Sequence, residues 1–289
     1  MSPETLAIWL ALFSAITVAI TNFTVKRGGD VLAARVVMSS PMALCALPFA
    51  FFVPVPPIEL WPRVGLALLV HAFYQFCMIR ALHRGDLSLV FPVMRGLAPL
   101  IVGVLAFMFL GEALSVMAIA GLTLATGALI VFALPENTDS ATRALNRTAL
   151  FWAAMTALGV GAYTVSDASV IRDMPVRESY IVWLFLLDGI PVFLALLFVR
   201  RGHVLADLRP QIKASVIGGV SGFLSFGALL YALSISESAA LMTALRETSV
   251  VFAALLGIVY LKEGFGWRRG IAAGTLALGL VLMQIGGSA

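Results

Sequence analysis

Residues 88–112 read SLVFPVMRGLAPLIVGVLAFMFLGE, an apolar run with an arginine, Arg95, several turns inside it. The run is long enough to cross a bilayer, which takes about 20 residues of α-helix. An arginine at the centre of a membrane helix costs roughly 2.5–3.5 kcal/mol, so Arg95 is expected to face a helix bundle or a wet cavity. Pro99 lacks the amide hydrogen that would bond to the carbonyl of Arg95, which predicts a kink at this point.

The same pattern returns later in the chain. A shift of 151 residues aligns Arg95 with Arg246, and a shift of 140 relates residues 23–25 to residues 163–165. Recurrence of one pattern predicts two similar halves. We therefore expect a first repeat over residues 1–137, a linker over residues 138–147 and a second repeat over residues 148–289.

The whole chain is strongly apolar. Of its 289 residues, 61% are hydrophobic and 12% are charged, and the mean hydropathy is +1.02. Soluble domains have about 45–50% and 25%, so the composition predicts a multi-pass membrane protein that has the lipid bilayer as a partner. The net charge of +4 is spread over the connections without a basic run, so no nucleic-acid partner is expected.

About ten apolar runs reach spanning length. They lie near residues 5–25, 33–53, 63–82, 87–110, 115–134, 148–170, 179–199, 213–233, 238–261 and 268–286. An odd number of spans in each half makes the second half enter the membrane from the opposite face. The expected fold is all-α, with about ten transmembrane helices arranged as two inverted five-helix repeats.

This organisation resembles the EamA-type transporters of the drug/metabolite transporter superfamily. The resemblance rests on the two five-span halves, the short turn within YQFCMIRALHRGDLSLVFPVMRGLAPL (residues 74–100), and the endings Leu-Gly-Glu and Leu-Lys-Glu at 110–112 and 261–263. It implies a secondary transporter with a central cavity between the halves, which moves amino acids, other metabolites or drugs, commonly outward. We expect the protein to lie in the cell membrane, and specifically in the inner membrane of a bacterium.

The orientation in the membrane stays open. Lysines and arginines gather in the connections after odd-numbered runs, and the positive-inside rule then places both termini outside the cytoplasm. The family resemblance implies cytoplasmic termini instead.

The pattern of reactive residues does not indicate an enzyme. His71, His83 and His203 have no metal-ligand or nucleophile partner at local spacing, and the sequence contains no GxxxxGK[ST] phosphate loop. We therefore expect no enzyme activity, no metal, no cofactor and no use of ATP as the energy source.

Arg95 and Arg246 are the first candidates for substrate binding because they occupy equivalent positions inside their spans. A guanidinium binds a carboxylate with two parallel hydrogen bonds, so a pair of arginines favours a small organic anion or zwitterion, with amino acids as the leading class. In the other interpretation, each arginine is neutralised by an acidic neighbour and only ties helices together. Glu247 points about 100° away from Arg246 on a helix and could face the cavity or a neighbouring helix.

Several further polar residues could line the same cavity. The candidates are Tyr74, Gln75, Asn22 and Tyr163, each inside an apolar run. Alternating access needs a point at which the helices can bend. The two prolines of residues 88–112 that precede or follow Arg95, Pro92 and Pro99, are the candidate hinge.

Proton coupling requires a group that can change its charge inside the membrane. Asp188 lies near the middle of the run 179–199, where burial disfavours a charged carboxylate, and it could alternatively be the static partner of an arginine. His71 titrates near neutrality, and it could instead make a helix-to-helix hydrogen bond. Glu247 is the third candidate. The proton-coupling glutamate in the first helix of the related small multidrug exporters has no counterpart here, because residues 5–25 include no acidic residue.

Two features concern helix packing. Glu112 and Glu263 end their apolar runs, where a carboxylate opposes the helix dipole, so each should have a partner such as a loop N–H or a lysine. Residues 270–274 form a GxxxG motif and residues 121–125 a looser version, both typical of close helix packing. The motifs fit a monomer and a homodimer equally.

Two other functions remain open at this point. A broad exporter of drugs or hydrophobic cations would use Asp188 and Glu247, and the arginines would then be structural. A non-transporting membrane scaffold would use the GxxxG faces for assembly.

Overall fold

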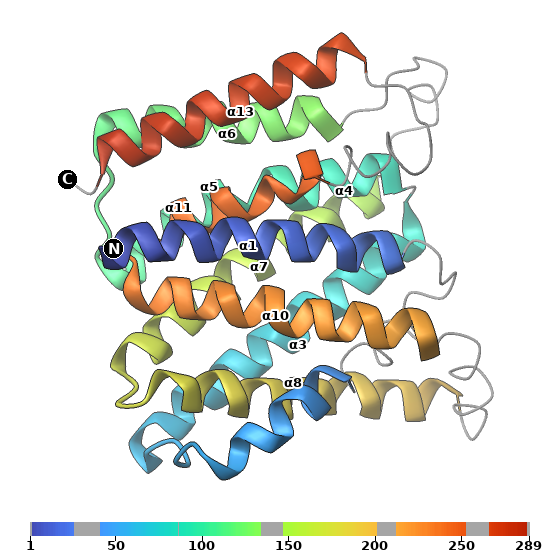
Figure 1. Ribbon diagram of the computed structural model, residues 1–289. Coiled ribbons are helices and arrows are strands. Elements are labelled where there is room, and N and C mark those ends of the chain that lie inside the picture. Colours follow the sequence, from blue (N-terminus) through green and yellow to red (C-terminus); the bar gives the residue numbers. More distant parts are fainter. Residues whose placement is uncertain are drawn as a thin grey trace. The chain divides into compact units, whose positions relative to one another are not determined.

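The computed structural model describes residues 2–25, 41–85, 87–133, 147–200, 212–252 and 266–287. Every regular element in these ranges is a helix, which confirms the all-α part of the predicted fold (Figure 1). A helical turn over residues 41–46 leads into η1. The elements in chain order are α1 (Pro3–Val25), η1 (Leu47–Phe51), η2 (Ile58–Leu60), α3 (Trp61–Arg84), α4 (Leu87–Gly96), α5 (Ala98–Leu110), α6 (Val116–Ala133), α7 (Arg147–Asp173), α8 (Arg177–Arg200), α10 (Ile212–Ile235), α11 (Ala239–Glu247) and α13 (Trp267–Gly286).

Within the described ranges, six helical segments are long and apolar enough to cross a membrane. They are Pro3–Ile20, Ile58–Arg84, Val93–Leu110, Arg147–Asp173, Val216–Ile235 and Trp267–Gly286. Pro41–Phe51 and Val116–Phe132 are shorter apolar helices. The predicted count of ten is therefore not confirmed, and the runs expected near 33–53 and 238–261 lie partly outside the described residues.

The chain forms two compact units. Unit 1 consists of Met1–Ala72 and Ser166–Ile235, and unit 2 consists of Phe73–Val165 and Ser236–Ala289. Both units therefore contain residues of both predicted repeats. Two boundaries between the units fall within α3 and α7, and the third falls between α10 and α11. Most of the predicted linker lies outside the described residues, so the repeat boundaries stay a prediction.

In unit 1, α1 packs along α10 (Figure 1). The contact face of α1 is a stripe of small residues at four-residue spacing, which lets two membrane helices approach closely. The buried alanines of this stripe are Ala7, Ala11, Ala15 and Ala19. Two hydrogen bonds then join the helices: the hydroxyls of Ser14 and Ser225 lie 3.2 Å apart, and the Ser225 hydroxyl donates to the Ser14 carbonyl at 2.9 Å.

A buried cluster in unit 1 joins α3, α7, α8 and α10. Because these helices present their apolar residues to one another, the polar residues one or two turns further along are held at fixed positions. The members of the cluster are Val64, Ala67, Val170, Ile171, Met174, Tyr180, Leu184 and Leu230.

In unit 2, α6 packs along α13 (Figure 1). A Cβ atom added at Gly121 would lie 2.5 Å from the carbonyl oxygen of Gly279, so the backbones touch there and only glycine fits. The close packing predicted for residues 121–125 is confirmed. The motif at 270–274 behaves differently, since a Cβ at Gly274 would meet no atom of the described structure within 4 Å.

In each of the two apolar runs that contain a predicted binding arginine, the helix is interrupted just after Arg95 or Arg246. Leu97 alone separates α4 from α5, and Pro99 lies in the first turn of α5. α11 ends before Thr248, whose hydroxyl donates to the carbonyl of Leu245 at 2.6 Å, and helix resumes at 249–252. A proline explains the first break. In the second, a side chain bonds to its own backbone and competes with the helical pattern.

The short helix α11 lies in the buried interior of unit 2. All nine of its residues are buried, and it packs against α5, α6 and α13. Two side chains satisfy its first N–H groups: the hydroxyl of Ser238 accepts from the Leu241 N–H at 3.2 Å, and the carboxylate of Glu112 accepts from the Ala239 N–H at 2.8 Å. The backbone partner expected for Glu112 is confirmed, whereas Glu263 lies outside the described residues.

Candidate functional site

An ion pair inside unit 2 joins the ends of the two broken helices. Arg95 lies in the last turn of α4, and Glu247 is the final residue of α11. The Arg95 Nη1 and Glu247 Oε1 atoms are 3.0 Å apart. The Glu247 side chain is 1% exposed and that of Arg95 is 16% exposed, so the ion pair is largely buried and the Arg95 guanidinium is neutralised by an acidic neighbour.

Three more residues of unit 2 surround this ion pair. Arg246 precedes Glu247 in the last turn of α11 and is buried. Tyr163 of α7 lies within electrostatic range of both arginines and Glu247, and its ring packs edge-to-face on Tyr74 of α3 at 5.1 Å. We call Arg95, Arg246, Glu247, Tyr74 and Tyr163 the arginine cluster. All five were predicted as substrate-binding residues, and they lie together.

The arginine cluster has one cation more than it has anions. Among these five residues, two guanidinium groups and one carboxylate give a net positive charge, and a positive charge attracts negatively charged groups. The second carboxylate oxygen of Glu247, Oε2, is buried and has no hydrogen-bond donor among the described residues. A buried acceptor without a donor is unfavourable and would be satisfied by an N–H group of a ligand.

The other predicted residues can be placed less fully. Gln75 is buried on α3, one turn after His71. Asn22 lies in α1 and Pro92 in α4, but their side chains fall outside the described residues. Pro99 lies at the break between α4 and α5. The binding and hinge roles of these residues stay predictions.

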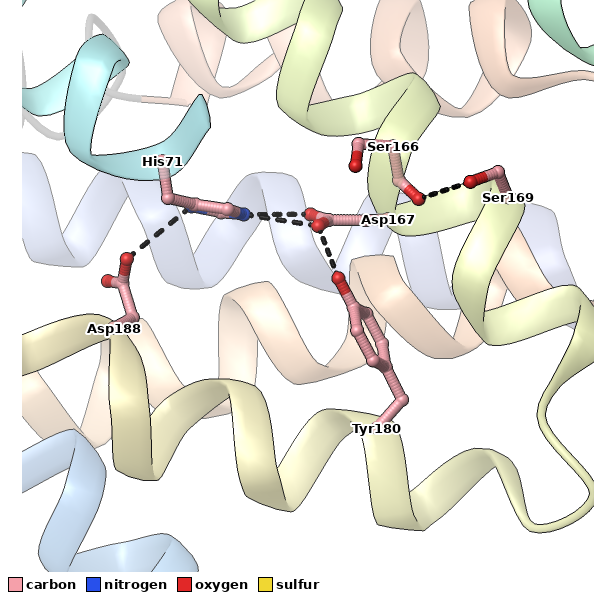
Figure 2. A network of polar contacts seen from close by, with 6 residues as sticks. All are labelled: His71, Ser166, Asp167, Ser169, Tyr180 and Asp188. Atoms are coloured by element: carbon pink, nitrogen blue, oxygen red, sulfur yellow. Dashed lines mark hydrogen bonds and ion pairs between the residues drawn. The ribbon is translucent and has the colours of Figure 1, made fainter. Parts of the chain in front are cut away.

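A second polar cluster lies in unit 1 (Figure 2). The Nε2 atom of His71 is 3.0 and 3.2 Å from the two carboxylate oxygens of Asp167, and the Tyr180 hydroxyl donates to Asp167 at 2.6 Å. On the other side of the ring, Nδ1 of His71 faces Asp188 at 3.7 Å. We call His71, Asp167, Tyr180 and Asp188 the histidine cluster.

Burial differs sharply within the histidine cluster. Asp167 and Tyr180 are fully buried and His71 nearly so, whereas the Asp188 side chain is 24% exposed. The ring of Phe226 from α10 packs edge-to-face against His71 with centroids 5.6 Å apart. Asp188 is therefore the exposed end of the cluster, and the other three side chains form its buried end.

Sequence reasoning singled out His71 and Asp188 separately, and the structure brings them together. It missed Asp167 and Tyr180. Asp167 carried a usable signal, because it is a carboxylate inside the apolar run 148–170, and an acidic residue at membrane depth needs a partner. Tyr180 carried none, since a tyrosine near the start of a span is ordinary in membrane proteins.

Comparison with known proteins places this architecture in a family. A family model described as the EamA-like transporter family matches residues 4–134 and 147–285. No curated protein matches the chain. One solved structure, titled "Crystal structure of protein", has a TM-score of 0.75 at 16% identity over 98% of this chain and 96% of that chain, which shows a shared fold. Because two matches of one model cover most of the sequence, the chain belongs to the EamA-like transporter family and is a multi-pass membrane transporter.

Proposed function

We propose that the protein is a secondary transporter of small zwitterions or organic anions, with amino acids as the leading class. The observation that carries this proposal is the arginine cluster, in which Arg95 is partly exposed beside a buried Glu247 with one oxygen lacking a donor. Family membership supports transport but leaves the substrate open.

An amino acid matches the cluster at both of its charged groups. Its carboxylate would accept hydrogen bonds from the guanidinium groups of Arg95 and Arg246, whose planar geometry suits two parallel bonds. Its ammonium group would donate to Oε2 of Glu247. A simple carboxylate would satisfy the arginines alone, so the unpaired oxygen favours a zwitterion.

The position of the cluster at two helix breaks also supports a transport site. Transporters place substrates where helices are discontinuous, because the free backbone groups and dipoles of half-helices can bind charged groups. Arg95 and Arg246 each lie within two residues of such a break. In our proposal Pro92 of α4 and Pro99 at the first break form the hinge for alternating access.

The remaining features of the proposal come from the sequence. Two inverted repeats would give alternating access if they exchanged conformations with each other. Export across the inner membrane of a bacterium, without a cofactor and by a monomer or homodimer, fits the family resemblance.

Counterflow in liposomes tests the proposal. The full-length protein is reconstituted, the liposomes are loaded with one unlabelled amino acid, and entry of the same labelled amino acid is measured across a panel. Wild-type protein should show counterflow for at least one amino acid, and Arg95→Ala and Arg246→Ala should lose it at normal expression. Arg63→Ala is the matched control, because Arg63 is an exposed arginine of unit 1 that pairs with Asp173.

A second comparison separates zwitterions from anions. Glu247→Gln should reduce counterflow of the amino acid far more than counterflow of the same molecule without its amino group. Equal loss for both would mean that Glu247 only neutralises Arg95. Flux of hydrophobic cations that survives both arginine substitutions would instead support a drug exporter, and no flux with any substrate would support a scaffold.

A further inference from the structure

The last turns of α3 run beside the first turns of α7 in unit 2. A Cβ atom added at Gly85, which directly follows α3, would lie 2.7 Å from the Cβ atom of Ala149 near the start of α7. Ala81 and Ala153 share a buried cluster with Ala149. All of these residues belong to unit 2, so side chains on the outer faces of the two helices can form one continuous surface.

Arg80 lies on this surface, one turn before the end of α3, with its guanidinium over two aromatic rings. Its Cζ atom is 5.1 Å from the ring centroid of Phe76 and 5.9 Å from that of Trp152. The Trp152 ring packs edge-to-face with Phe76 and with Phe151, both at 5.5 Å. These rings hold the guanidinium in place by cation–π attraction and leave its N–H groups able to donate hydrogen bonds. Arg80 makes no hydrogen bond or ion pair with the residues that the structure describes.

The lengths of the two helical segments indicate the depth of Arg80 in the membrane. Ile58–Arg84 and Arg147–Asp173 each contain 27 residues. Such a segment is about 40 Å long, whereas the hydrocarbon core of a bilayer is about 30 Å thick. The end of α3 and the start of α7 are therefore expected among the lipid headgroups. Arg80 and Trp152 lie about one turn inside these ends, at the level where tryptophan is enriched in membrane proteins.

The surface is positively charged and has an exposed apolar border. Arg80, Arg84 and Arg147 are exposed, and the described residues 73–85 and 147–157 contain no aspartate or glutamate. Phe76 and Phe151 are 48% and 55% exposed. An anionic phospholipid matches both parts, since its headgroup is attracted to arginines and its acyl chains to apolar side chains. A zwitterionic lipid gains less, because its own cation offsets the charge of its phosphate.

We propose that the headgroup of an anionic phospholipid binds to this part of unit 2, which we call the phospholipid surface. The phospholipid surface consists of Phe76, Arg80, Arg84, Arg147, Phe151 and Trp152. The guanidinium of Arg80 donates to the phosphate, for which its planar geometry is suited. The other two arginines add electrostatic attraction. This site lies outside the arginine cluster and does not depend on which substrate is transported.

The first test counts bound lipids. Full-length protein in a nonionic detergent is mixed with equal amounts of phosphatidylglycerol and phosphatidylcholine, and native mass spectrometry measures the ratio of the two lipids retained. Wild-type protein should retain more phosphatidylglycerol. Arg80→Gln should reduce phosphatidylglycerol binding by roughly fivefold, the effect of one arginine beside an anionic headgroup, and leave phosphatidylcholine binding unchanged. Arg63→Gln is the control, because Arg63 is an exposed arginine of unit 1 that already pairs with Asp173.

The second test removes an aromatic ring and keeps all three arginines. Trp152→Leu should lower phosphatidylglycerol binding by a smaller factor, roughly two- to fivefold, because the ring no longer orients Arg80. The control is Trp9→Leu, since Trp9 is an exposed tryptophan on α1, which has no lysine or arginine. Equal phosphatidylglycerol binding in Trp152→Leu and wild type would contradict the role given to the ring.

The third test needs no variant and identifies the source of the phosphate. Phosphatidylglycerol should raise the thermal unfolding midpoint of the wild-type protein more than phosphatidylcholine does, because the lipid bridges α3 and α7. Glycerol 3-phosphate at the same phosphate concentration should not raise it, since it has no acyl chains. In about 1 M sodium chloride the advantage of phosphatidylglycerol should shrink, because charges are screened beyond about 3 Å.

Three outcomes would overturn the proposal. The first is an unchanged ratio of the two lipids in Arg80→Gln. The second is equal stabilisation by glycerol 3-phosphate and phosphatidylglycerol, which would indicate an anion site that needs no membrane. The third is a dimer that dissociates in Arg80→Gln while the lipid ratio stays that of the wild type, which would show that this surface contacts a second copy of the chain.

Discussion

The two units differ in both the charge and the backbone of their polar clusters. The arginine cluster of unit 2 is cationic and lies at the ends of α4 and α11, where the helices stop. The histidine cluster of unit 1 is acidic and lies within the continuous helices α3, α7 and α8. A broken helix frees backbone groups for a substrate, whereas an unbroken one keeps them bonded and leaves only side chains to react. This difference supports the proposal that the substrate binds in unit 2.

The largest effect is expected from removing Arg95, one of the two cations of the arginine cluster. Arg95→Ala leaves Glu247 charged and buried without its partner, which should lower the free energy of unfolding by about 3–5 kcal/mol. Counterflow should fall by about 30-fold or more, as for a lost buried charge contact. Both are measurable, by denaturation in mixed micelles and by initial uptake rates.

A double variant distinguishes the structural effect of Arg95 from its binding effect. Arg95→Ala with Glu247→Gln removes both charges and should recover most of the stability. Counterflow should stay low, because no guanidinium fork replaces Arg95. Recovery of transport together with stability would show that the ion pair is only a tie between helices.

The next effect tests the buried end of the histidine cluster. Tyr180→Phe removes the hydroxyl that donates to Asp167, and a hydrogen bond to a charged group is worth about 1.5–3 kcal/mol. The free energy of unfolding should fall by that amount, while counterflow at equal pH persists. Tyr231→Phe is the control in the same unit, since its hydroxyl bonds to none of the residues that the structure describes. Equal loss in the two variants would contradict the role given to Tyr180.

A smaller effect tests the frame that holds the arginine cluster. Gly121→Ala pushes a methyl group into the backbone of α13, and such overpacking costs about 1–3 kcal/mol. A methyl group at Gly274 on α13 meets no atom of the described residues within 4 Å, and alanine replaces a poor helix former, so Gly274→Ala should be neutral or stabilising by up to about 1 kcal/mol. Thermal unfolding of both variants checks the prediction, which fails if Gly274→Ala is the more harmful.

The smallest effect concerns the frame of unit 1. Ser225→Ala removes the hydrogen bonds between α10 and α1, and bonds of this kind between membrane helices average about 0.6 kcal/mol. The control is Ser169→Ala, because the Ser169 hydroxyl bonds to Ser166 within the same helix. A loss in Ser225→Ala as large as that in Gly121→Ala would mean that polar contacts, rather than close packing, hold these helix pairs.

Much of the proposed substrate site was predictable because charge is rare in this chain. Arg95, Arg246 and Glu247 stand out against apolar neighbours, and the spacing of 151 residues pointed to equivalent positions. The pairing of Arg95 with Glu247 was not predictable. The two residues are 152 positions apart in the chain. The sequence around each residue does not indicate which face of its helix is turned toward the other residue.

The histidine cluster shows the same limit more strongly. In a soluble helix the apolar face indicates the interior, but a membrane helix is apolar on all sides, so hydrophobic periodicity does not show which way His71 points. Its partner Asp167 is 96 residues away. The GxxxG motifs illustrate the same point, since residues 121–125 pack against a helix, whereas Gly274 contacts no helix in the described part of the chain.

The amino-acid sequence by itself determined that the chain is helical, lies in a membrane and carries one pattern twice, because these properties follow from composition and order along the chain. Only the tertiary structure decided which charges meet: Glu247 with Arg95, and His71 between Asp167 and Asp188. The reason is that an ion pair depends on the rotation of each helix about its axis, and that rotation is set by packing between helices distant in sequence.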